Sequence, residues 1–286
     1  MFLKVCSASS KNLTRNLIIW LLVLTVFLIV LYHVSKGYTT YYDPLLGETI
    51  SDTDGRYVMS QNKYDYLAVN TVRPWVLFYI MPIFTVFSVS LLLKRDYTDG
   101  FFEIERSNGL SILKYVSGRI LTLVSVNLLL CTAVSFFGYY AYYFTRGGVN
   151  GLSGIKLLAD SLPRVLYVVF YVALPSILFY IGITYFACSL MQNSLVGCVV
   201  GVGTAIIDYL GNYILRINFP TKYLDYVSPL SAKQNLYFGL IGTEYFEIET
   251  YNQFTASDAA ISVLYKIGIS LLCLILSYFF TKKRNT

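Results

Sequence analysis

The sequence predicts an all-α integral membrane protein with six transmembrane helices and both termini in the cytoplasm. Hydrophobic residues make up 56% of the chain and charged residues 13%, which is about half the charged fraction of a soluble domain. The apolar residues occur in long blocks, and about 20 apolar residues are needed to cross a bilayer as a helix. The basic residues are concentrated in alternate connecting segments, the pattern that sets membrane topology.

Six apolar blocks are long enough to be predicted as spans. They cover residues 17–34, 74–93, 120–144, 165–187, 195–215 and 261–280. No small-residue cleavage site follows the first block, so it is predicted to be an uncleaved anchor rather than a signal peptide. The blocks leave no room for a soluble domain, and residues 1–286 are expected to form a single transmembrane domain.

The connecting segments differ in length and charge. If both termini are cytoplasmic, the inside segments hold eleven basic residues in a little over fifty positions. The outside segments hold ten basic residues in about twice that length, together with eleven acidic ones. This asymmetry predicts that the long loops 35–73 and 216–260 are extracellular, and that the charged loop 94–119 is cytoplasmic.

Residues 1–16 are predicted to form an amphipathic helix on the inner membrane surface. At about 100° per residue, one side carries Phe2, Val5, Cys6, Ser9 and Leu13, and the other carries Lys4, Lys11 and Arg15. The basic side would face anionic headgroups or a partner protein. The alternative is a basic terminus that only sets the topology.

The cytoplasmic loop has a second amphipathic pattern. On a helix, Tyr97, Phe101, Ile104 and Asn108 share one face, with Asp99, Glu103 and Arg106 opposite. Such a helix suits docking to a soluble partner, although a charged face of this kind also occurs on a plain solvated connector.

This layout and this loop resemble the permease subunits of type 2 ABC exporters. In that family the loop after the second span begins with an acidic residue, then a glycine four positions on and a glutamate three positions later. A basic residue opens the third span. The matching residues here are Asp96, Gly100, Glu103 and Arg119, with Ser107 where the family often has serine.

The sequence also departs from the family pattern at three points. Asp96 replaces the usual leading glutamate, Phe101 a common threonine, and Gly109 lies near where a proline is typical. A second similarity is Tyr-Val-Ser-Pro-Leu at 226–230, which is similar to the family's Leu-Ser-Pro motif before its sixth span.

The resemblance implies a bacterial plasma-membrane assembly of two permease chains, expected to be a homodimer, above two separate ATP-binding subunits. ATP and magnesium would bind in those subunits, and re-entrant helices would lie within 216–260. The residues implied to couple the loop to the ATP-binding subunit are Asp96, Asp99, Gly100, Phe101, Glu103, Ile104, Arg106 and Arg119.

No residue pattern predicts chemistry in the chain itself. It has no glycine-rich phosphate loop, and Gly197, Gly201 and Gly203 fall inside the fifth predicted span, where glycines permit close helix packing. The five cysteines lack metal-ligand spacing, and His33 is the only histidine. The chain is therefore expected not to be an enzyme, to hold no cofactor or metal, and to bind no nucleic acid.

The expected function is ATP-driven export of an amphipathic or hydrophobic substrate, with a peptide or drug favoured. The alternative is an ATP-independent channel or lipid scramblase. An intramembrane enzyme would need more polar groups at membrane depth than the spans contain.

Asp208 and Lys266 are the two ionisable residues best placed inside spans. Each is costly at membrane depth, by about 2.5–3.5 kcal/mol at a span centre. In the predicted topology they lie at matching depth on consecutive spans, so they could pair inside the bundle. The alternative is that each side chain extends separately toward headgroups or water.

Overall fold

The computed structural model describes residues 2–36, 39–43, 48–52, 80–98, 100, 107, 109, 111–145, 166, 168–218 and 256–283. The α-helices are α1 (Phe2–Thr14), α2 (Leu17–Lys36), α5 (Met81–Thr98), α7 (Ile112–Thr145), α9 (Leu174–Met191), α10 (Ser194–Asn218) and α13 (Ala256–Lys283). A π-helix, η2, covers Val168–Ala173, and strands β1 (Thr39–Asp43) and β2 (Glu48–Asp52) form a hairpin.

The predicted helical fold is confirmed, and several of its helices are compatible with a membrane protein, while the six spans stay a prediction. In the described ranges, three stretches are long and apolar enough to cross a membrane, namely Ile112–Val134, Leu174–Met191 and Ala260–Lys282. The bent pair Leu3–Thr14 and Leu17–Ile29 would be a fourth if it forms one span. Helices α2, α5, α7, α9, α10 and α13 nevertheless occupy the six predicted blocks in order.

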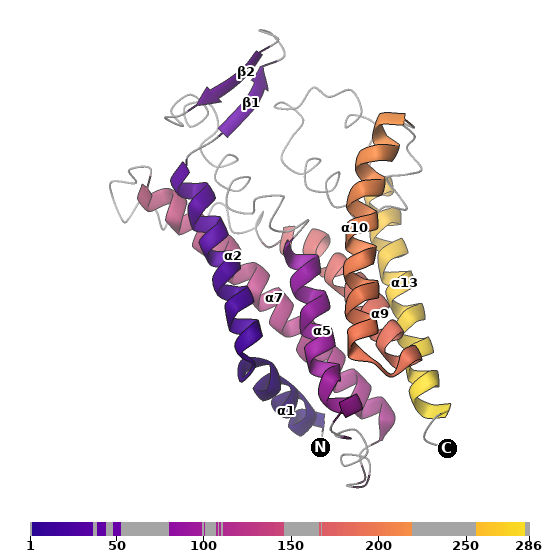
Figure 1. The fold of residues 1–286 in the computed structure, drawn as a ribbon. Coiled ribbons are helices and arrows are strands. Elements are labelled where there is room, and N and C mark those ends of the chain that lie inside the picture. The colour runs from indigo at the N-terminus through magenta and orange to yellow at the C-terminus, as the bar shows by residue number, and fades with distance from the viewer. Residues whose placement is uncertain are drawn as a thin grey trace.

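Helix α9 is the centre of the packing. Helices α13, α10, α5 and α7 all contact it, while α1 and α2 pack against α7 (Figure 1). Both chain ends lie at one end of the bundle, where α5 ends, α7 begins and α9 turns into α10 (Figure 1).

The α9–α10 turn is shorter than the gap of residues 188–194 between the fourth and fifth predicted blocks. Only Gln192 and Asn193 separate the two helices. Gln192 adopts the left-handed conformation, with φ of 51°, and the Asn193 side chain accepts a hydrogen bond from the Leu195 amide at 2.9 Å. These two residues end one helix and begin the next.

The predicted faces of the N-terminal helix agree with the structure. Val5, Ser9 and Leu13 are buried, and Lys4, Lys11 and Arg15 are exposed. The buried face lies against α7, where the Thr122 hydroxyl and the backbone carbonyl of Cys6 are 3.5 Å apart. The apolar face of α1 is therefore covered by protein.

Two features differ from the sequence prediction. The fourth block is not one regular helix, because η2 precedes α9 and Pro175 stands at the start of α9. Proline lacks the amide hydrogen that the preceding turn requires. In the loop 35–73, β1 and β2 pair antiparallel from Thr39↔Asp52 to Asp43↔Glu48, and no strand was predicted there.

Glycines allow the helices around α9 to approach closely. A Cβ added to Gly197 would lie 2.0 Å from the Cys188 sulfur, and one added to Gly201 would lie 2.5 Å from the Thr184 hydroxyl. A Cβ added to Gly182 would lie 2.9 Å from the Ser270 backbone on α13. The predicted packing role thus holds for Gly197 and Gly201, whereas a Cβ on Gly203 would meet nothing within 4 Å.

Candidate functional site

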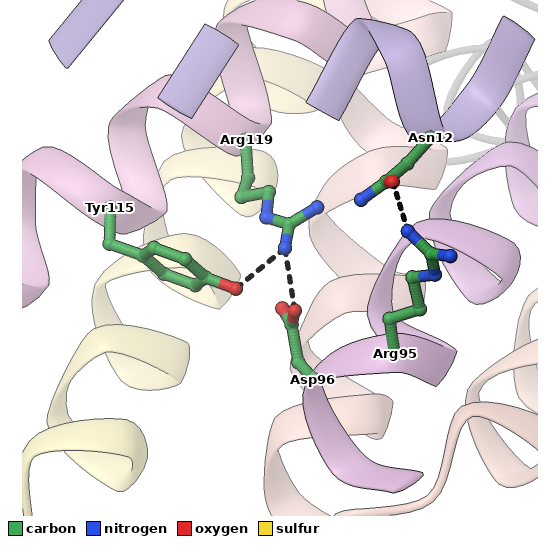
Figure 2. Close-up of polar contacts among 5 residues, drawn as sticks. All are labelled: Asn12, Arg95, Asp96, Tyr115 and Arg119. Atoms are coloured by element: carbon green, nitrogen blue, oxygen red, sulfur yellow. Dashed lines mark hydrogen bonds and ion pairs between the residues drawn. The ribbon is translucent and has the colours of Figure 1, made fainter. Parts of the chain in front are cut away.

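A buried ion pair joins the two helices on either side of the charged loop. Asp96 lies in the last turn of α5, and Arg119 lies two turns inside α7. The Arg119 Nη2 donates to Asp96 Oδ1 at 2.6 Å (Figure 2). The side chains are 1% and 5% exposed, respectively, so water barely screens their attraction.

Tyr115 completes the surroundings of the arginine. It precedes Arg119 by one helical turn, which places both side chains on the same face of α7. Arg119 Nη2 donates to the Tyr115 hydroxyl at 2.7 Å, and the guanidinium carbon lies 4.9 Å from the centre of the tyrosine ring. The cation is thus held by a carboxylate, a hydroxyl and an aromatic face.

The electrostatics of Asp96 reflect a balance of burial and pairing. Burial raises the pKa of Asp96 to about 6, while the charge of Arg119 and hydrogen bonding by Tyr115 favour the ionised carboxylate. The 2.6 Å contact with Arg119 therefore opposes the effect of burial and favours the charged form of Asp96.

The ion pair is also connected to α1 and α9. Arg95, next to Asp96, donates from Nη1 to the Asn12 side-chain oxygen on α1 (Figure 2). Tyr185 of α9 is buried in the same apolar cluster as Tyr115 of α7. One compact group of side chains therefore links α1, α5, α7 and α9 beside the loop.

The structure brings together only part of the predicted coupling set. Asp96 and Arg119 are in direct contact, and Gly100 has φ of 62° just after α5, a conformation that suits the glycine after a helix end. Asp99, Phe101, Glu103, Ile104 and Arg106 lie outside the described residues.

The expected helix bounds around the loop need correction. Arg119 does not open its helix, because α7 begins at Ile112, and Asp96 lies within α5 rather than in the loop. Tyr97 lies in α5, which ends at Thr98, and Leu113 lies in α7, which begins at Ile112, so neither residue belongs to a separate loop helix.

Asp208 and Lys266 both lie on helices that pack on α9. Asp208 of α10 accepts a hydrogen bond from the Tyr180 hydroxyl of α9 at 3.2 Å. Lys266 is fully buried on α13, one turn before Ser270, which donates to the Leu178 carbonyl of α9 at 2.7 Å. The direct pair between Asp208 and Lys266 stays a prediction.

Sequence reasoning missed Tyr115, Asn12 and Tyr180 as polar partners. The spacing of Tyr115 and Arg119, four residues apart, is a signal that could have identified the first. Asn12 and Tyr180 meet their partners only through tertiary packing, which no local pattern encodes.

All five cysteines are free thiols. Among the residues with described positions, no group of three or more His, Cys, Asp or Glu side chains is arranged to hold a metal ion. Comparison of the chain with protein-family models, curated proteins and solved structures finds no match.

Proposed function

We propose that the chain is the membrane-spanning subunit of an ATP-driven exporter of the ABC class. It would cross a bacterial plasma membrane six times with both termini in the cytoplasm, and act as a homodimer above two ATP-binding subunits. The observation that carries this proposal is the buried contact between Asp96 and Arg119, which ties together the two ends of the charged loop.

The geometry fits a loop that receives and passes on mechanical work. Thirteen residues separate Thr98, the end of α5, from Ile112, the start of α7. Because the ion pair fixes α5 to α7, a displacement of the loop would move both helices together. The hydrogen bond from Arg95 to Asn12 would extend that motion to α1, and the apolar cluster shared by Tyr115 and Tyr185 would extend it to α9.

ATP would be hydrolysed by the partner, because the sequence contains no phosphate-binding loop. The purified chain alone is accordingly expected to show no ATPase activity. The substrate class follows the sequence argument, which favours an amphipathic peptide or a hydrophobic drug. A glycan exporter would be expected to carry a soluble recognition domain, for which the apolar blocks leave little room.

The test is transport by the complete complex. The chain would be reconstituted in liposomes with a candidate ATP-binding protein, and movement of fluorescent amphipathic peptides and hydrophobic dyes would be followed. The proposal expects movement that requires ATP and stops in a partner variant unable to hydrolyse it. ATP-independent movement of a solute or of labelled lipid would favour the channel or scramblase instead.

The charged loop face provides a second readout. Replacing Glu103 and Arg106 with alanine should lower transport and partner binding without changing membrane insertion, because the predicted loop face is exposed. Transport at the native rate in this double variant would contradict a coupling role for the loop.

A further inference from the structure

Helices α1 and α2 meet at an elbow toward the end of the bundle that holds both termini (Figure 1). The two helices meet at 68° around Arg15 and Asn16. The Asn16 side chain accepts a hydrogen bond from the Ile18 amide at 3.0 Å and so begins α2. The Trp20 indole donates to the Thr14 carbonyl at 2.6 Å. These contacts give the elbow a defined shape.

The elbow carries uncompensated positive charge. Lys11 and Arg15 are four residues apart, on one face, and both are exposed. Neither side chain makes a hydrogen bond or ion pair with any residue that the structure describes. The first acidic residue of the chain is Asp43, so no carboxylate from α1 or α2 is available to them.

Exposed apolar side chains follow these cations in the sequence, at the start of α2. Leu17 is 71% exposed and Trp20 is 55% exposed. Tryptophan favours the membrane–water interface because its ring is apolar and its N–H is polar. A soluble anion would satisfy the cations but leave the apolar side chains in water. A phospholipid satisfies both, with its phosphate against the cations and its acyl chains against Leu17 and Trp20.

We propose that the α1–α2 elbow is a binding site for an anionic phospholipid. Lys11 and Arg15 hold the headgroup, and Trp20 and Leu17 contact the upper part of the acyl chains. A zwitterionic lipid binds more weakly because its choline group brings a positive charge to the two cations. The site is independent of the proposed export function, since it rests only on α1 and α2.

The elbow supplies its own probe. The chain has two tryptophans, Trp20 and Trp75, so Trp75→Phe leaves Trp20 as the only indole. This variant would be placed in vesicles of phosphatidylcholine that contain either brominated phosphatidylglycerol or brominated phosphatidylcholine with the same chains. Bromine quenches the indole only at close range. We expect stronger quenching by the anionic lipid at equal mole fraction.

Removing the two basic side chains should remove the preference of the elbow for the anionic lipid. The affinity of the elbow for phosphatidylglycerol is expected to fall about fivefold for each basic residue lost in Lys11→Gln/Arg15→Gln. The conservative variant Lys11→Arg/Arg15→Lys should keep the preference, which separates loss of charge from a change in the fold.

A matched control removes the same charge elsewhere. Lys114 on α7 and Lys282 on α13 are exposed basic residues away from the elbow, and Lys114→Gln/Lys282→Gln should leave the quenching preference unchanged. Equal quenching of Trp20 by the two brominated lipids in the Trp75→Phe protein would overturn the proposal. An equal loss of preference in the two glutamine variants would also overturn it, because general surface charge would then explain the effect.

Discussion

The junction of α5 with α7 and the packing of α10 and α13 on α9 hold helices together by different means. At the first, one buried ion pair and a tyrosine fix the helix ends. At the second, glycines bring the helices so close that an added methyl group would overlap a neighbouring atom. Removing side-chain atoms should lower the stability of the first junction, whereas adding atoms should lower the stability of the second.

The difference also separates two possible roles. The ion pair joins two specific side chains on either side of the charged loop, so a movement of the loop would act on it directly. Close packing through glycine sets the distance between helices and offers no group that another protein could act on. Of the two junctions, we therefore expect only the first to yield variants that lose transport activity while keeping their stability.

The largest effect is expected from breaking the ion pair on one side. Arg119→Met leaves the Asp96 carboxylate buried without its cation, and such changes cost about 3–5 kcal/mol. Titration with sodium dodecyl sulfate in mixed micelles would measure the free energy of unfolding. Lys114→Met, an exposed change on the same helix, is the control and should stay within about 0.5 kcal/mol of the native protein.

The next effect concerns the α9–α10 contact. Gly201→Ala inserts a methyl group 2.5 Å from the Thr184 hydroxyl and 2.7 Å from Val86, and overpacking of this kind costs about 1–3 kcal/mol. Gly203→Ala lies on the same helix with nothing within 4 Å, and should stabilise it by about 0.5–1 kcal/mol. In the same unfolding assay, Gly201→Ala should therefore lower the free energy of unfolding and Gly203→Ala should raise it. A change of the free energy of unfolding in the same direction for both variants would mean that α10 does not pack through Gly201.

The α9–α13 contact allows the same comparison. Gly182→Ala meets the Ser270 backbone at 2.9 Å, whereas Gly268→Ala meets nothing within 4 Å. Backbone atoms cannot turn away as a side chain can, so the helices must separate and the cost should again be about 1–3 kcal/mol. If Gly182→Ala is as stable as Gly268→Ala, this interface is looser than described.

A smaller effect is expected at the polar contact between α9 and α10. Tyr180→Phe removes the hydroxyl that donates to Asp208 at 3.2 Å, for a cost of about 0.5–1.5 kcal/mol for a single hydrogen bond. The double variant Tyr180→Phe/Asp208→Asn, compared with the two single variants, measures the energetic coupling of these two side chains. Additive losses would show that Asp208 is stabilised mainly by other groups.

The sequence predicted the helical framework well for a physical reason. Hydrophobic blocks of membrane length and the faces of residues 1–16 are local patterns, and the helices follow them. Asp96 and Arg119 could be singled out as a pair of family-like positions, but their contact depends on how α5 packs against α7. The η2 segment and the β1–β2 hairpin depend on backbone geometry that hydrophobicity does not encode.

The most direct test of the proposed coupling role uses a variant that repairs stability without restoring charge. Asp96→Asn/Arg119→Met removes both charges, so neither is left buried alone, and it should recover much of the stability lost in Arg119→Met. In the reconstituted complex, the number of substrate molecules moved per ATP hydrolysed would be compared with that of the native protein. If the ion pair couples the loop to the helices, this variant should have near-native stability and move markedly fewer substrate molecules per ATP. A native ratio in this stable variant would contradict the coupling role, because the pair would then only hold the fold together.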